Sequence, residues 1–145
     1  MKHLFKNDPA KIISILGDDQ LEFESSMIQF SERVEIIQCI VINFDIYASL
    51  FIGGLRIENV IVKCPVKWMA GGHNKQPIIL KDCVFEEFVD FEDCCFDHEI
   101  IFENVQFIKG TNFLGNKGTP VEVSFEFKPK MVDVTGELDI NTFNK

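Results

Sequence analysis

The densest cluster of ionisable side chains lies between residues 82 and 103. This stretch contains nine acidic residues and neither Lys nor Arg; they are Asp82, Glu86, Glu87, Asp90, Glu92, Asp93, Asp97, Glu99 and Glu103. Carboxylates at this density could attract a basic partner through their combined field. Acid–base catalysis needs more than density, because the pKa values of the catalytic pair must be perturbed within a cleft. We therefore expect either an acidic binding surface or a solvated coat that keeps the protein soluble, and no catalytic residue.

Two thiols, a carboxylate and an imidazole fall within residues 94–98. A structural zinc site needs four converging ligands, usually supplied as spaced pairs. Cys94 and Cys95 are adjacent, so on a strand one would point inward and the other outward. The chain also lacks a G-x-x-x-x-G-K-[ST] phosphate loop and a G-x-S-x-G nucleophile elbow. We therefore expect no metal, no cofactor and no enzyme activity.

Residues 70–77, Ala-Gly-Gly-His-Asn-Lys-Gln-Pro, predict a loop that leaves a regular scaffold. Trp68, the only Trp of the chain, stands at its base. Loops on a rigid scaffold often carry binding residues. Two interpretations stay open: a recognition loop that uses Trp68 and His73, or a tolerated surface insertion with Trp68 packed beneath it.

The elements that would position these residues follow from an 11-residue repeat over residues 78–113. Apolar residues recur in four columns: Ile78, Val89, Ile100 and Thr111; Leu80, Phe91, Phe102 and Phe113; Cys83, Cys94 and Val105; Phe85, Phe96 and Phe107. Such a repeat buries its apolar face only by stacking on neighbouring units, which is typical of a solenoid. Residues at i and i+2 share one face of a strand, and the gap of three between such pairs predicts a corner. Two units would form one four-sided coil of 22 residues.

The pairs Cys83-x-Phe85, Cys94-x-Phe96 and Val105-x-Phe107 resemble the pentapeptide-repeat proteins. In that family a small inward residue stands two places before a Leu or Phe, and the chain winds a right-handed quadrilateral β-helix. Here steps of five and six residues alternate, so the likeness is to a degenerate, 11-residue double repeat. The resemblance also suggests a basic partner, since some members are similar to duplex DNA in shape and charge. A likeness at the level of fold does not by itself carry function.

We therefore predict an all-β, single-stranded, right-handed parallel β-helix of about four coils, as a single domain over residues 1–145. Asp8, Pro9 and Gly17 provide helix start and stop signals, which predict a helical cap over residues 1–20. The coils would occupy residues 21–118, including the loop at 70–77. The register of residues 42–54 is open: Tyr47, Leu50 and Ile52 fit inward slots only if Asp45 fills one as well, and Gly53-Gly54 would shorten this unit by one residue.

Residues 119–145 predict C-terminal strands. Apolar and polar residues alternate from Val121 to Phe127, and Thr135-Gly136-Glu137 stands between two apolar pairs as in a hairpin. This segment would either cap the second end of the solenoid or pair across a dimer.

Composition limits the compartment and the partners. The net charge is −9, which opposes direct binding to nucleic acid. Five cysteines without a secretory signal pattern favour reduced thiols in the cytoplasm. The absence of 18 consecutive apolar residues predicts no membrane span.

From these features we expect a non-enzymatic protein-binding module, in the manner of an acidic inhibitor or antidote that acts on a basic partner. The predicted binding residues are Glu86, Glu87, Asp90, Glu92, Asp97, Glu99, Trp68 and His73. Two alternatives stay open. One is a structural β-helix that self-associates into a homo-oligomer, and the other is a small carbohydrate-binding or carbohydrate-cleaving β-helix.

Overall fold

The computed structural model describes residues 2–4 and 13–143, and these residues form strands without any helix. The strands are β1 (Lys2–Leu4), β2 (Ile13–Leu16), β3 (Leu21–Glu24), β4 (Gln29–Phe30), β5 (Val34–Ile37), β6 (Ile40–Asp45), β7 (Leu50–Phe51), β8 (Leu55–Val62), β9 (Val66–Lys67), β10 (Ile78–Phe85), β11 (Val89–Asp90), β12 (Cys95–Phe96), β13 (Ile100–Phe107), β14 (Ser124–Phe125) and β15 (Lys130–Thr135). Within this part of the chain there is consequently no helix that could cross a membrane.

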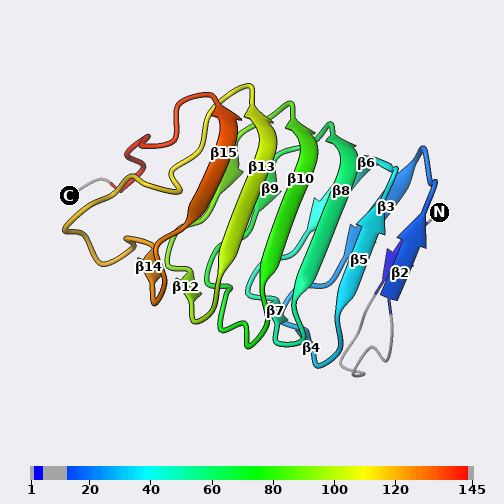
Figure 1. Cartoon of the computed structure of the whole chain (residues 1–145), viewed down its shortest axis with the longest axis horizontal. Coiled ribbons are helices and arrows are strands. Elements are labelled where there is room, and N and C mark those ends of the chain that lie inside the picture. The colour runs from blue at the N-terminus through cyan, green and yellow to red at the C-terminus, as the bar shows by residue number, and fades with distance from the viewer. Residues whose placement is uncertain (1, 5–12, 144–145) are drawn as a thin grey trace.

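The strands stack in parallel as a β-solenoid of about four turns, which confirms the predicted solenoid (Figure 1). Ile78 pairs with Ile100 of the following coil and with Leu55 of the preceding coil. Leu55 in turn pairs with Val34, one coil earlier still. Like residues therefore meet along the solenoid axis at intervals of one coil.

The apolar columns form the core, as the repeat predicts. The coil of residues 78–99 presents inward pairs on four successive segments, and three further pairs follow up to residue 113. Every member of the four columns is 0–1% exposed. The rings stack along the axis: Phe85 and Phe107 lie 5.3 Å apart with nearly parallel planes. Fifteen Phe residues are thus largely explained by packing between neighbouring coils.

One corner of the solenoid recurs at the same place in each coil. Its backbone takes the left-handed conformation, with positive φ at Gly17, Gln38, Asn59, Asp82, Asn104 and Asp133. Gly, Asn and Asp tolerate this region better than other residues, which explains why they dominate the column. The corner lies within the long strands, between Leu80 and Cys83 in β10, where the sequence predicted a break in alternation.

The register of residues 42–54 differs by one residue from the interpretation that placed Tyr47, Leu50 and Ile52 inward. The inward residues are Phe44, Ile46, Ser49 and Phe51. The turn from Val41 to Phe44 is one residue shorter than the equivalent turn from Phe85 to Val89. The short unit therefore begins before Asp45, and Gly53 does not shorten the coil; a Cβ on Gly53 would lie 2.5 Å from the backbone of Glu32.

The predicted helical cap over residues 1–20 is not supported. Residues 5–12 lie outside the described residues, and Ile13–Leu16 form strand β2, paired with β5. Gly17 has a φ of +74°, which suits a helix C-terminus and the recurring corner equally well. At Gly17 the residue that was interpreted as a helix stop therefore forms a corner of the coil.

The C-terminal strands are present without the predicted hairpin. β14 pairs with β12, and β15 pairs with β13, both in parallel. After Gly136 the chain turns a corner and runs along residues 111–114, where the Thr111 N–H donates to the Glu137 carbonyl at 2.8 Å. These residues continue the solenoid through a last coil that is longer than the one before it, since Ile79 pairs with Ile101 and Ile101 pairs with Lys130.

Candidate functional site

The predicted acidic residues surround one coil and do not gather on a single side. Glu86 and Glu87 follow β10, Asp90 lies in β11, and Asp97 and Glu99 lie between β12 and β13. None of the nine carboxylates between residues 82 and 103 is buried, in agreement with the predicted outward coat. A flat partner could therefore meet only part of this set at one time.

Most of these carboxylates are already engaged within the chain. Contacts are Lys109 Nζ to Glu87 Oε2 at 2.6 Å, Asn112 Nδ2 to Asp90 Oδ1 at 2.9 Å, Thr142 Oγ1 to Glu92 Oε1 at 2.7 Å, His73 Nδ1 to Asp97 Oδ2 at 3.0 Å and Lys130 Nζ to Glu99 Oε2 at 2.9 Å. The Lys130 ammonium, through its hydrogen bond and its charge, lowers the pKa of Glu99. Glu86 makes no such contact among the described residues. The ion pairs with Lys109 and Lys130 reduce the charge that Glu87 and Glu99 can offer to a partner, whereas the neutral amide and hydroxyl donors leave the charges of Asp90 and Glu92 in place.

Several of these contacts join equivalent positions of two successive coils. Asp82 accepts from Asn104 Nδ2 at 2.8 Å, Glu87 pairs with Lys109, and Asp90 accepts from Asn112. The two members of each pair are separated in the sequence by one full coil. Complementary residues at this spacing were thus a signal in the sequence, and the sequence interpretation missed it by treating the acidic residues alone.

Trp68 is fully buried and cannot serve as a surface contact for a partner in this structure. Its indole stacks on Phe91 at 5.1 Å and meets the edges of Phe51 and Phe96 at 6.2 and 6.4 Å. The indole N–H finds no acceptor among the described residues. Of the two interpretations for this residue, the structure matches the one in which Trp68 packs beneath the segment that follows it.

Residues 70–77 do not leave the scaffold as predicted, because they form one side of a coil. Gly72 bridges Leu50 of the preceding coil and Cys95 of the following coil. A Cβ on Gly72 would lie 2.1 Å from the Cys95 carbonyl oxygen, so the close approach of these coils requires glycine here. Buried Asn74 accepts from the Asp97 N–H at 3.2 Å and donates to the Gln76 carbonyl at 2.9 Å.

His73 is exposed and paired with Asp97, so these two predicted binding residues do lie together. The pair stands beside the buried amide of Asn74, which also holds the backbone of Asp97. No group of three or more His, Cys, Asp or Glu side chains among the described residues could hold a metal ion. The geometry at His73 thus links two coils.

Three of the five cysteines, Cys39, Cys83 and Cys94, are small buried core residues. Cys94 is buried while Cys95 faces outward, as predicted, and the described residues contain no disulfide. Desolvation raises the pKa of Cys83 to about 12 and also raises the pKa values of Cys39, Cys64 and Cys94. A raised pKa keeps a thiol protonated and unreactive.

A second corner of the solenoid carries an apolar stripe that ends in carboxylates. Met27, Ala48, Ala70 and Asp93 hold left-handed backbone at this corner, each in a successive coil. Exposed Met27 and Tyr47 begin the stripe, and Met69 continues it toward Glu92. We call residues 27, 47, 48, 69, 70, 92 and 93 the apolar–acidic corner.

A notch of about 180 Å³ lies at the acidic end of this corner. It is lined by Tyr47, Met69, Ala70, Glu92, Asp93 and Val121, with no Lys or Arg. Glu92 is the one predicted binding residue that lines it. The sequence interpretation missed Tyr47 because the one-residue register error placed this side chain in the core, and an exposed aromatic next to carboxylates was therefore not considered.

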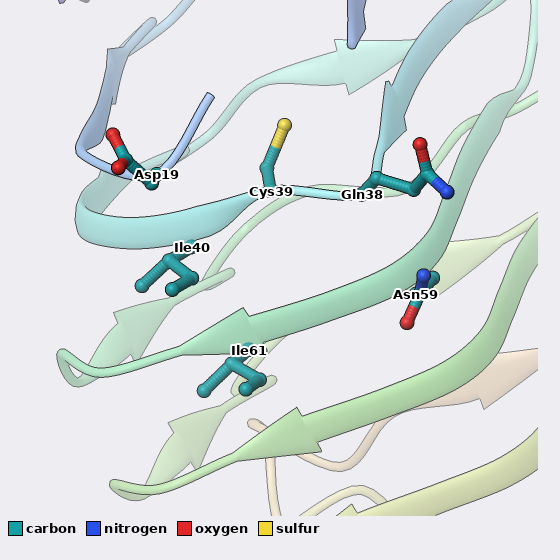
Figure 2. Close-up of a pocket in the computed structure, with 6 residues that line it drawn as sticks. All are labelled: Asp19, Gln38, Cys39, Ile40, Asn59 and Ile61. Atoms are coloured by element: carbon teal, nitrogen blue, oxygen red, sulfur yellow. The ribbon is translucent and has the colours of Figure 1, made fainter. Parts of the chain in front are cut away.

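A shallower hollow of about 270 Å³ lies on the side formed by the second halves of the long strands (Figure 2). Ile40 and Ile61, which pair across successive coils, form its apolar part, and Gln38 and Asn59 belong to the recurring corner. Asp19 completes the rim. Cys39 also lines the hollow, and burial raises the pKa of its thiol, which keeps the thiol protonated.

No family model, curated protein or solved structure matches this chain. The candidate site therefore depends on the geometry of the described residues alone.

Proposed function

We propose that this chain is a non-enzymatic protein-binding solenoid that receives a basic segment of a partner at the apolar–acidic corner. The observation that supports the proposal is the notch in which Tyr47 and Met69 stand beside Glu92 and Asp93. Such a site suits a Lys or Arg side chain, whose methylene stem needs apolar contact and whose head needs negative charge.

The chemistry of each lining residue fits this occupant. A cation over the face of Tyr47 gains a cation–π attraction of roughly 0.5–1 kcal/mol at an exposed site. The thioether of Met69 adapts to varied shapes, and Met27 extends the same stripe by two coils. Glu92 is partly oriented by the Thr142 hydroxyl, which leaves its second carboxylate oxygen for a partner.

The net charge supports the same choice of partner. With 23 acidic and 14 basic residues, the chain would attract a basic protein over a distance and suppress contact with nucleic acid. An inhibitor or antidote role is the form of this function that we favour. We further propose a right-handed, quadrilateral, pentapeptide-repeat-like coil, supported by four inward segments per coil, and a cytoplasmic location, supported by the unpaired thiols.

The test is affinity capture from a lysate of the source organism with three forms of the protein. The first is wild type and the second is Glu92→Gln/Asp93→Asn, which keeps shape and the Thr142 hydrogen bond. The third is Glu32→Gln/Glu35→Gln, which removes the same charge on another side of the solenoid. We expect a basic protein that wild type and the Glu32/Glu35 form retain, that the Glu92/Asp93 form loses, and that salt releases.

Equal retention of that protein by all three forms would place binding outside the apolar–acidic corner. If both double variants lost the protein equally, net charge and not the apolar–acidic corner would control binding. A Tyr47→Ala form adds a test of the apolar half, because cation–π contact and stem packing disappear while the charge stays constant.

A further inference from the structure

The last strand of the solenoid offers an open edge. β15 pairs with β13 on one side, and no described strand lies on its other side (Figure 1). An exposed strand edge presents unpaired N–H and C=O groups that can pair with another chain. This surface is separate from the apolar–acidic corner, so the inference does not depend on the proposed function.

Apolar side chains surround this edge. Met131 continues the column of Phe102 but is 36% exposed, whereas Phe102 is 1% exposed. Val134 is only partly buried, although its partner Val105 is fully buried. Outside these columns, Val132, which pairs with the exposed Glu103, and Phe127 are 59% and 49% exposed. The core columns thus reach the C-terminal side of β15 without a cover among the described residues.

We propose that a second copy of this chain covers this edge, with the two β15 strands paired antiparallel around a two-fold axis between Val132 and Asp133. In that register Met131 faces Val134 of the other copy, and Phe127 faces Leu138. Both are apolar pairs, and a two-fold axis forms each of them twice. A two-fold arrangement also satisfies the open β15 edges of both copies at once.

The charges near the axis support a second copy over an unrelated strand. Lys128 would face Glu137, and both residues are exposed without an ion pair among the described residues. Symmetry again gives this attraction twice. Glu126 and Asp139 would face each other farther from the axis, where both are exposed and water and salt screen their repulsion.

The first test compares the mass of wild type with that of Val132→Asp by light scattering after size exclusion. We expect wild type at twice the chain mass of 16.6 kDa. The variant would bring a carboxylate opposite Asp133 of the second copy and raise the dissociation constant by at least about tenfold, because like charges directly opposite one another are destabilising. Ile108→Asp is the matched control: Ile108 is also 59% exposed but lies in the preceding coil.

The second test uses charge exchange and does not depend on a hydrophobic residue. Lys128→Glu and Glu137→Lys should each weaken the dimer, because like charges would meet twice. A mixture of the two variants should restore it, because each copy then meets the opposite charge at both contacts. A monomeric wild type would overturn the proposal, and so would equal effects of Val132→Asp and Ile108→Asp or a mixture without recovery.

Discussion

Two neighbouring coils build the same side of the solenoid with different residues. In the regular coil, Cys94 and Phe96 fill the inward positions of residues 94–96. In the coil before it, Gly71 and His73 occupy the equivalent places, and His73 points to solvent. Trp68, one side earlier in the same coil, supplies the missing ring by reaching Phe51 and Phe96. The core therefore requires aromatic volume in each coil, while the position that provides it can move.

The largest expected loss of stability comes from removing the Trp68 ring. Trp68→Ala should cost about 3–5 kcal/mol of unfolding free energy, as large-to-small aromatic changes in cores do. Trp68→Phe should cost much less, because the indole N–H has no acceptor to lose among the described residues. Denaturant unfolding of both variants and of Phe96→Ala would measure the difference. A mild effect of Trp68→Ala, close to that of Trp68→Phe, would contradict the substitution of one ring for the other.

The next largest effect concerns the backbone of the same two sides. Gly72→Ala should destabilise the protein by roughly 2 kcal/mol or more, because its φ is +99° and the new Cβ would meet the Cys95 carbonyl. Cys95→Ala, at the equivalent position, should change stability by less than about 0.5 kcal/mol, since Cys95 is partly exposed. Thermal unfolding of both variants tests this contrast, and equal shifts in Tm would refute it.

A smaller effect on stability, visible at alkaline pH, is expected from the cysteines of one inward column, in which Cys and Val alternate from coil to coil. Cys39, Val60, Cys83 and Val105 alternate along it. Burial raises the pKa of Cys83 to about 12, so the folded state favours the neutral thiol while the unfolded chain loses its proton from about pH 9. Stability should therefore fall as pH rises from about 9 toward 12.

Cys83→Val removes this titration at similar volume. The variant should match wild type within about 1 kcal/mol at pH 7 and lose less stability at alkaline pH. Urea unfolding at pH 7 and pH 10 gives both values. An identical alkaline loss in both proteins would show that Cys83 does not contribute to it.

The smallest effect concerns the acidic coat at the boundary with the last coil. Lys130→Met should raise the pKa of Glu99 toward its ordinary value, because Lys130 supplies the hydrogen bond and the charge that lower it. The Glu99 contribution to stability exists above its unfolded pKa and disappears as pH falls through the folded value. Titration of the Glu99 carboxyl by NMR in both proteins measures the change.

The regular region could be predicted from sequence because each inward position repeats without insertion. From Ile78 to Phe113 every predicted inward residue is buried. The prediction failed where local signals have two causes: Gly17 suits both a helix end and a coil corner. It also failed at Tyr47, because a turn one residue shorter between Val41 and Phe44 could be placed at Gly53-Gly54 equally well. The apolar–acidic corner depends on that register, so the sequence could not reveal it.

The recurring left-handed corner limits which insertions and deletions the fold can accept. Since Gly17, Gln38, Asn59, Asp82, Asn104 and Asp133 mark one place in each coil, a gene that lost or duplicated a whole coil would still join matching columns. Removal of residues 78–99, for example, would bring Ile100 beside Leu55, which are the two partners of Ile78. Loss of one residue within a side would misalign every later column. We therefore expect descendants of this chain to differ in length by complete coils or at corners.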